Sequence, residues 1–205
     1  MGARLEKLKR MSTSTQNDEL PLVAALKRVG CEAWRNEGVD GKMNRKLGDV
    51  SFRLKKGGPV YSIEVQVVGS QNRYSRFSYG VDKVKLYRGA GSYDDAFVLL
   101  GCYERTGGDE MIFVACQAPR FHKMLEDGGG NSELHTPGFV GSKPYYTVTP
   151  ESVVSLEGSV VGATIEEATH ELVQMVRTTQ KGVSTTGASR YTAKRRKKDG
   201  QLQVG

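Results

Sequence analysis

Two runs of alternating polar and apolar residues, joined by a short turn, constrain this fold more than any other feature of the sequence. Residues 48–54 (GDVSFRL) and 60–68 (VYSIEVQVV) both show the period of two that is typical of a β-strand. Between them, KKGGP contains the glycines and the proline of a turn. The pattern predicts a hairpin with its apolar side chains on one face and with Asp49, Glu64 and Gln66 on the other.

The rest of the sequence predicts an α/β domain. The continuous apolar run at 96–103 (AFVLLGCY) is typical of a strand buried on both faces, and a further strand follows at 111–116. A short strand is predicted around 31–35, and strand-like residues recur at 145–156. Helices are predicted at 18–30, around 77–87, at 120–127 and at 164–178, the last with Thr164 or a neighbour as N-cap. We therefore expect one domain over 18–180, between a polar arm (1–17) and a basic, flexible tail (181–205).

The net charge of +7 is unevenly distributed along the chain. Residues 27–88 contain fourteen Lys and Arg against six Asp and Glu, whereas residues 89–180 contain five against thirteen. The densest basic cluster is KRRKK at 194–198. This segregation favours a positive surface that binds a polyanion, although blocks of charge also occur as ordinary solvated faces.

Several functional classes are disfavoured by the sequence. No apolar run approaches the roughly 20 residues that span a bilayer, so we expect no membrane partner. The three cysteines are far apart and form no CxxC pair, which argues against a disulfide framework or a zinc ribbon and suits a cytoplasmic protein. Neither an HExxH zinc motif nor a GxSxG nucleophile motif is present.

The polar residues of the hairpin indicate metal chemistry. Asp49 and Glu64 both lie about a strand's length from the turn, so pairing brings their carboxylates together. Two carboxylates and a backbone carbonyl, here that of Val65, suit Mg²⁺, which polarises a phosphodiester and lowers the pKa of attacking water. A buried, unpaired Glu64 would be costly, so it either faces solvent or meets a positive group. Alternatively, Asp49 is a turn cap, and Glu64 and Gln66 form the solvated side of an edge hairpin.

The order of these elements resembles a known family. A strand with Asp49, a strand with Glu64 and Gln66, a helix and an apolar strand resemble the PD-(D/E)xK nuclease core over about residues 45–104. The stretch IEVQ, followed by NRYSRF and then by Asp82 and Lys83, is similar to the BglII-like type II restriction endonucleases. Gly48 stands where many members have a proline. The resemblance implies a restriction-endonuclease-like fold, with a central mixed β-sheet flanked by helices.

The same resemblance implies roles for the site residues. Asp49 and Glu64 are the expected metal ligands, and Gln66 occupies the position, usually lysine, that orients or activates water. Because Gln66 cannot act as a base, it positions water, and proton removal falls to solvent or to the substrate phosphate. A further acid, Glu19 or Glu37, is a candidate to complete the site, although either also suits a surface or capping role.

The resemblance also implies a partner and a reaction. We expect a site-specific type II restriction endonuclease that hydrolyses double-stranded DNA with Mg²⁺, for which Mn²⁺ substitutes, as a homodimer with one site per strand. One alternative is a structure-directed junction or repair nuclease of the same fold, and another is a non-catalytic DNA-binding protein. The expected DNA contacts are Arg73, Arg76, Lys83, Lys194, Arg195, Arg196, Lys197 and Lys198.

Overall fold

The computed structural model describes residues 19–36, 48–67, 77–103, 111–129, 132–138 and 142–180. Within these residues the larger sheet has the order β1-β2-β3-β5-β6-β9 and the smaller sheet the order β4-β8-β7. The larger sheet consists of β1 (Glu32–Arg35), β2 (Val50–Arg53), β3 (Tyr61–Val67), β5 (Ala96–Tyr103), β6 (Met111–Gln117) and β9 (Val160–Gly162). The smaller sheet consists of β4 (Phe77–Gly80), β8 (Tyr145–Val148) and β7 (Glu133–His135). The helices are 19–28, α2 (Val81–Arg88), the 3₁₀ turn η3 (Tyr93–Asp95), α3 (Ala118–Glu126), α4 (Pro150–Val154) and α5 (Ile165–Gln180).

The larger sheet is mixed. Strands β3 and β5 are parallel, while β1–β2, β2–β3, β5–β6 and β6–β9 are antiparallel. A parallel pair needs a crossover connection, and β4, α2 and η3 lie in that connection between β3 and β5. The predicted class, an α/β fold with a central mixed sheet flanked by helices, is confirmed.

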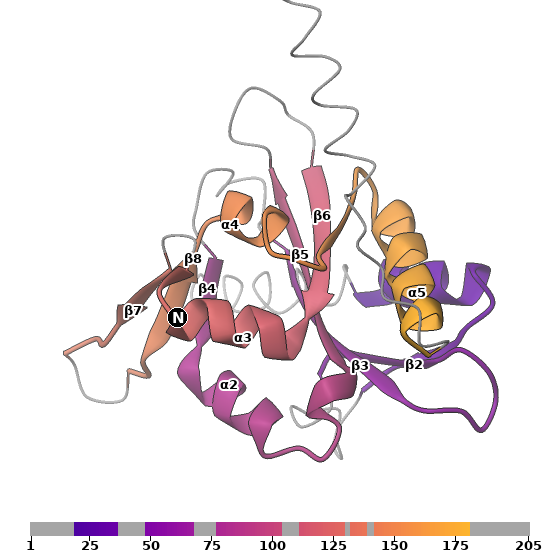
Figure 1. The fold of residues 1–205 in the computed structure, drawn as a ribbon, viewed down its shortest axis with the longest axis horizontal. Coiled ribbons are helices and arrows are strands. Elements are labelled where there is room, and N and C mark those ends of the chain that lie inside the picture. The colour runs from indigo at the N-terminus through magenta and orange to yellow at the C-terminus, as the bar shows by residue number, and fades with distance from the viewer. Residues whose placement is uncertain are drawn as a thin grey trace, which may run out of the picture.

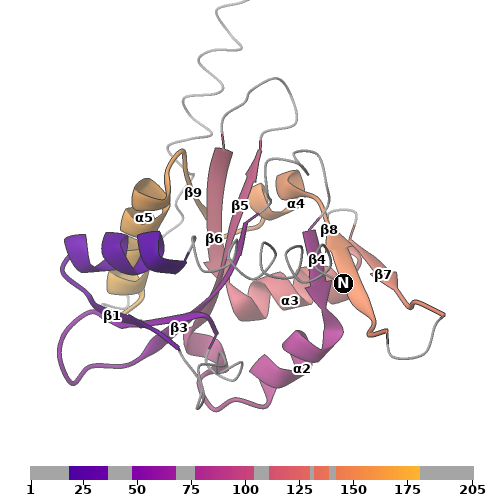
Figure 2. The ribbon, with the colours of Figure 1, turned by 180° about the vertical axis from the view of Figure 1, so that it is seen from behind.

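Helices cover both faces of the sheet (Figures 1 and 2). On the first face, the helix at 19–28 and α5 pack on a core that includes Val50, Phe52 and Ile63. On the second face, α2, α3 and the smaller sheet pack on a core that includes Val98 and Leu100. Because neighbouring strand residues point to opposite faces, the second face is also the one that Glu64 and Gln66 occupy.

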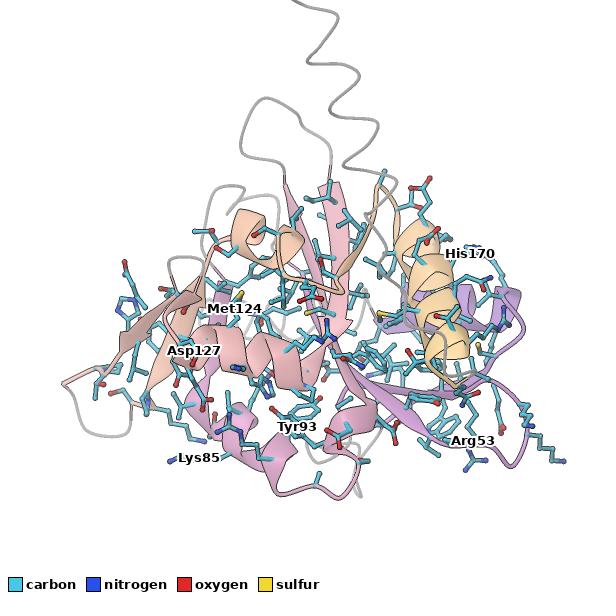
Figure 3. All side chains as sticks on the ribbon, in the orientation of Figure 1. Arg53, Lys85, Tyr93, Met124, Asp127 and His170 are labelled. Atoms are coloured by element: carbon cyan, nitrogen blue, oxygen red, sulfur yellow. The ribbon has the colours of Figure 1, made fainter. Side chains whose placement is uncertain are left out.

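Helix α5 matches its prediction closely. The Thr164 Oγ1 accepts a hydrogen bond of 3.1 Å from the backbone N–H of Glu167, which confirms Thr164 as the N-cap. Its buried side faces the first core, and His170 lies on its exposed side (Figure 3). Among the described helices, none has the length and apolar character needed to cross a membrane.

One predicted helix is wrong in its first half. The sequence predicts a helix around 77–87, but residues 77–80 form β4 and the helix begins at Val81. Phe77 and Tyr79 are both buried because β4 pairs with β8, where Phe77 faces Val148. The strand-like stretch at 145–156 likewise contains β8 and then the short helix α4. In both places tertiary pairing, rather than local periodicity, decides the structure.

Candidate active site

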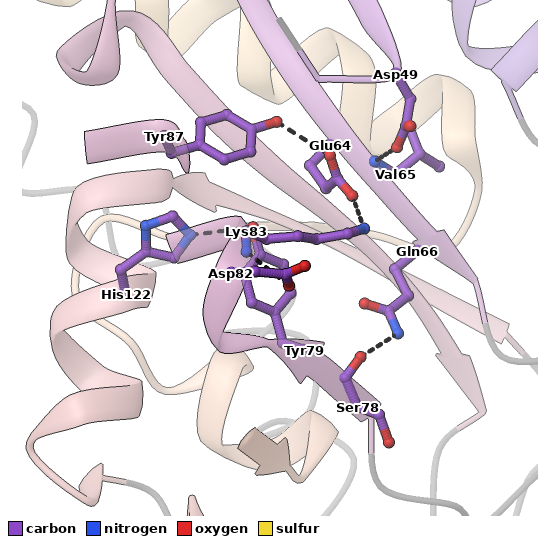
Figure 4. A network of polar contacts seen from close by, with 10 residues as sticks. All are labelled: Asp49, Glu64, Val65, Gln66, Ser78, Tyr79, Asp82, Lys83, Tyr87 and His122. Carbon is purple, nitrogen blue, oxygen red and sulfur yellow. Dashed lines mark hydrogen bonds and ion pairs between the residues drawn. The ribbon is translucent and has the colours of Figure 1, made fainter. Parts of the chain in front are cut away.

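Asp49 lies where the β2–β3 ladder ends. The last paired residues are Val50 and Ile63, so Asp49 and Glu64 are the next residues to face each other. The backbone N–H of Asp49 donates to the Ile63 carbonyl at 2.9 Å, and the N–H of Val65 donates to the Asp49 Oδ2 at 2.7 Å. The carboxylate therefore replaces a backbone acceptor at the end of the ladder, which fixes its position (Figure 4).

Gly48, which precedes Asp49, has a backbone conformation that proline cannot adopt. Its φ of +74° is one that proline, fixed near −65°, cannot adopt. A Cβ at this position would lie 2.6 Å from the Tyr87 Oη and 2.9 Å from the Ile63 carbonyl oxygen. Glycine therefore allows the chain to turn into Asp49 while the Tyr87 hydroxyl packs against its backbone.

A buried asparagine holds the same turn from β1. The Asn36 Nδ2 donates to the Gly48 carbonyl at 3.2 Å and to the Ser51 Oγ at 2.8 Å, and the Asn36 backbone N–H donates to the Asp49 carbonyl at 3.0 Å. Asn36 is 5% exposed. Because each of these bonds is buried, Asn36 fixes the backbone on both sides of the Asp49 side chain.

Glu64 is buried beneath α2, and a cation meets it. It is 4% exposed, and the Lys83 Nζ donates to its Oε1 while the Tyr87 hydroxyl donates to its Oε2 at 3.1 Å (Figure 4). Lys83 and Tyr87 are four residues apart and therefore share one side of α2. Of the two alternatives for Glu64, a solvent-facing carboxylate is wrong and a carboxylate met by a positive group is confirmed.

The electrostatics of the acidic pair differ from those of a surface carboxylate. Burial, and next the neighbouring charge of Glu64, raise the pKa of Asp49 from 3.8 to about 7. Burial also raises the pKa of Tyr87, so its hydroxyl stays protonated and acts as a donor. Two acids in such surroundings repel each other until a cation neutralises them, which is the behaviour expected of metal ligands.

The donor set fits a hard divalent cation. The N–H of Val65 points toward Asp49, and in a strand the carbonyl of the same residue points to the same edge. Two carboxylates and this carbonyl are oxygen ligands of the kind that Mg²⁺ prefers. Within the described residues there is no group of three His, Cys, Asp or Glu side chains that would hold a metal. Any further ligands must therefore be carbonyls, water, substrate or residues outside those ranges.

The Gln66 side chain is anchored to β4. Its Nε2 donates to the Ser78 carbonyl of β4 at 2.8 Å, which leaves the amide oxygen as its remaining acceptor. Gln66 is thus on the same sheet face as Glu64, as predicted. Lys83, predicted as a DNA contact, is an ion-pair partner of Glu64, and its side chain is 42% exposed. Its predicted contact with DNA stays a prediction.

Glu19 lies near the site but is engaged by an arginine. It is buried, and its Oε2 accepts from the Arg35 Nε at 2.6 Å. Its charge is one of the smaller contributions that raise the pKa of Asp49. The remaining predicted site residues lie outside the described ranges: Glu37, Arg73, Arg76, Lys194, Arg195, Arg196, Lys197 and Lys198.

A buried histidine supports the site from α3. His122 is fully buried, with its Nδ1 3.0 Å from the Tyr93 hydroxyl and its Nε2 3.0 Å from the Tyr79 hydroxyl. Burial lowers its pKa to about 4, so the ring is neutral and bridges the two tyrosines. Tyr79 in turn lies under Lys83, whose Nζ is 5.7 Å from the ring centre. Sequence reasoning missed four residues that support the site: Asn36, Tyr79, Tyr87 and His122. The only available signal was the i to i+4 spacing of Lys83 and Tyr87, which places these two side chains on one side of a helix.

No protein-family model matches the sequence, and no curated protein matches it. Two solved structures align with a large part of the chain. Archaeoglobus fulgidus Hjc, described as a Holliday junction resolvase from an archaeal hyperthermophile, aligns with a TM-score of 0.37 and 13% identity over 66% of this chain and 88% of its own. D212, described as a nuclease from a fusselovirus, aligns with a TM-score of 0.42 and 10% identity over 82% of this chain and 95% of its own. At these values the similarity assigns no activity to this chain.

Proposed function

We propose that this protein is a divalent-metal-dependent DNA endonuclease, with Asp49 and Glu64 as metal ligands. The observation that supports this most strongly is that the half-buried Asp49 faces the buried Glu64 at the end of the β2–β3 ladder, with the pKa of Asp49 raised to about 7. Lys83 offsets the charge of Glu64, but Asp49 has no such ion-pair partner among the described residues, and placing a second carboxylate beside Glu64 is unfavourable. A functional requirement for a cation accounts for it.

Asp49, Glu64 and the Val65 carbonyl would hold Mg²⁺, or Mn²⁺ in its place. When bound, such an ion polarises the phosphodiester and lowers the pKa of the attacking water. The chain itself supplies orientation and charge. Lys83 places an ammonium group beside the acids, where it can donate to a phosphate oxygen. The amide oxygen of Gln66 can accept a hydrogen bond from water and so orient it, but it cannot remove the proton.

The substrate class we favour is branched or otherwise structurally marked DNA. Three of the described cations around α2 are already paired with acids: Lys83 with Glu64, Arg88 with Glu126 and Lys143 with Asp82. Such cations respond to phosphate charge more readily than they read base edges, because bidentate base contacts need a free guanidinium or ammonium group. The site-specific restriction endonuclease, acting on duplex DNA as a homodimer, is the second candidate, and it rests on the resemblance of residues 45–104.

A cleavage assay separates these candidates. We would incubate the full chain with Mg²⁺ or Mn²⁺ and either a labelled four-way junction, a matched linear duplex or plasmid DNA. Cleavage confined to the junction supports the first candidate, and discrete plasmid fragments support the second. If neither DNA is cut with either metal, the endonuclease proposal is wrong.

Matched variants identify the site. Glu64→Gln should lower the cleavage rate at least 100-fold, because the ligand loses its charge, whereas Glu157→Gln, an exposed glutamate, should leave the rate unchanged. Lys83→Ala should lower the rate more than Lys85→Ala, since Lys85 lies on the same helix but is exposed. Full activity of Glu64→Gln would refute the assignment. Circular dichroism of each variant checks that it is folded.

A further inference from the structure

The sheet face that contains the acidic pair continues outward over β1 and the β2–β3 hairpin. Register places Trp34 opposite Ser51, and Ser51 opposite Ser62. Glu64 is two residues beyond Ser62, and Arg53 is two residues beyond Ser51, so these side chains point to the same side of the sheet. We define the outer hairpin surface as Trp34, Arg53, Lys55 and Lys56.

We propose that the outer hairpin surface binds the phosphate backbone of the DNA that enters the site. This inference rests on the proposed function, because it names where that substrate lies. The segment 51–63 contains Arg53, Lys55 and Lys56 and no Asp or Glu. Lys55 and Lys56 are exposed at the turn, and Arg53 lies at the outer end of the hairpin, away from α2 and α3 (Figure 3). Glu32 of β1 lies opposite Arg53, so the three cations outnumber the one acid that faces them, and a net positive surface suits a polyanion.

Arg53 is prepared for such a contact. Its guanidinium carbon lies 5.3 Å from the centre of the Trp34 ring, and its Nη1 is 3.8 Å from the Glu32 Oε2. The latter distance allows an ion pair but is too long for a hydrogen bond, and the Nε, which has no acceptor among the described residues, is buried and so does not face incoming DNA. Stacking on the indole therefore holds the group in place, and the Arg53 side chain is 32% exposed, so its exposed part is what a phosphate can contact. A phosphate oxygen is the acceptor that a planar guanidinium fits best.

The spacing allows one DNA strand to reach both places. Arg53 is four residues from Asp49 along β2, which is about 13 Å at the rise of an extended strand. This length corresponds to roughly four base-pair steps of duplex DNA. DNA with its scissile phosphate at the acids would therefore pass over Trp34 and Arg53 without bending sharply.

Trp34 makes the proposal directly measurable, because it is the only tryptophan of the 205 residues. We would titrate the full chain with a four-way junction and with duplex DNA in EDTA, where no cleavage occurs, and follow emission and acrylamide quenching. We expect a saturable change in emission, with Trp34 protected from acrylamide in the complex. Unchanged emission and quenching at DNA concentrations that saturate a gel shift would overturn the proposal.

Variants test the cations independently. Arg53→Ala should weaken binding about tenfold or more, because it removes a charge-assisted contact. The double variant Lys55→Ala/Lys56→Ala should lower the slope of log K against log salt by about 1.8. Lys27→Ala, an exposed lysine on the helix that covers the opposite sheet face, should change neither value. Equal affinities for Arg53→Ala and the unmodified chain would contradict the proposal.

The result is separable from the test of the endonuclease. Suppose that Glu64→Gln abolishes cleavage, while DNA leaves Trp34 emission unchanged and Arg53→Ala binds DNA with unchanged affinity. The proposed DNA contact of the outer hairpin surface is then wrong, and the endonuclease proposal stands. If the chain binds DNA through this surface but never cleaves it, the surface stands and the hydrolytic proposal fails.

Discussion

Replacement of Asp49 by asparagine should make the metal-free protein more stable. In the native protein this carboxylate is half-buried beside Glu64, and its pKa rises from 3.8 to about 7. A rise of roughly three pKa units corresponds to at most about 4 kcal/mol of unfavourable free energy when the group is ionised. The asparagine has a similar shape and retains an oxygen that can accept from the Val65 N–H. The variant thus removes the penalty and keeps the contact.

The sign of the pH dependence follows from the same shift. Because Asp49 binds its proton more tightly in the folded than in the unfolded state, its contribution to stability falls as the pH rises from about 4 to 7. Asp49→Asn should therefore exceed the unmodified chain in free energy of unfolding by up to about 4 kcal/mol at pH 8. That difference should shrink toward zero near pH 4.

Urea unfolding in EDTA at a series of pH values measures this difference. A suitable control is Asp82→Asn, because Asp82 is exposed and its pKa is lowered by Lys143, so this variant should be slightly less stable at pH 8. Added Mg²⁺ should stabilise the unmodified chain and not Asp49→Asn. An Asp49→Asn protein that is no more stable than the unmodified chain at pH 8 would refute the reasoning that the two acids are forced together.

Three further predictions concern other parts of the structure. Gly48→Ala should destabilise the fold by about 1–3 kcal/mol more than Gly57→Ala does in urea unfolding, because both have a φ near +75° but only Gly48 lacks space for a Cβ. Folding lowers the pKa of His122, so unfolding takes up a proton there and the protein should lose about 3 kcal/mol of stability as the pH falls from 6.5 to 4. His122→Gln, compared in the Asp49→Asn background, should abolish this loss. Deletion of residues 181–205 should lower the salt dependence of DNA binding in a filter or gel-shift assay. If all five cations of KRRKK contact phosphates, the slope of log K against log salt should fall by about 4.5.

The sequence predicted the parts of the fold that local periodicity determines. Strand β5 has the bounds 96–103 that its apolar run indicates, and β3 and α5 differ from their predicted ranges by one or two residues at each end. Strand β4 was not predicted, because FSYG is too short to show a period and becomes a strand only through pairing with β8. Local pattern determines long elements, whereas short ones depend on contacts between distant residues.

The same distinction applies to the site. That Asp49 and Glu64 face each other follows from hairpin register, which sequence alternation constrains strongly. The sequence indicated that a positive group could meet Glu64, but not which one. Lys83 is identified only in the structure, where the crossover connection brings α2 over β3. Asn36 and His122 gave no signal, because their partners lie 12–15 and 29–43 residues away in the chain. Polar residues that support a site through long-range contacts look like any others in a sequence.

Two residues beside the acidic pair depart from the pattern that the sequence resembles, and the contacts of each are visible in the structure. Where many members have proline, Gly48 admits the Tyr87 hydroxyl against the backbone. Where most have lysine, Gln66 is tied to β4, and the ammonium group comes instead from α2. The ammonium group beside Glu64 thus comes from α2 and not from β3.

Direct measurement of metal binding tests the central claim, that Asp49 and Glu64 together hold a divalent cation. Mn²⁺ binding can be followed by electron paramagnetic resonance, because the free ion gives a strong signal that decreases on binding. We predict that the unmodified chain binds Mn²⁺, that Mg²⁺ displaces it, and that Asp49→Asn and Glu64→Gln each lose this binding while Glu157→Gln retains it. Binding of equal strength and stoichiometry in all four proteins would contradict the account.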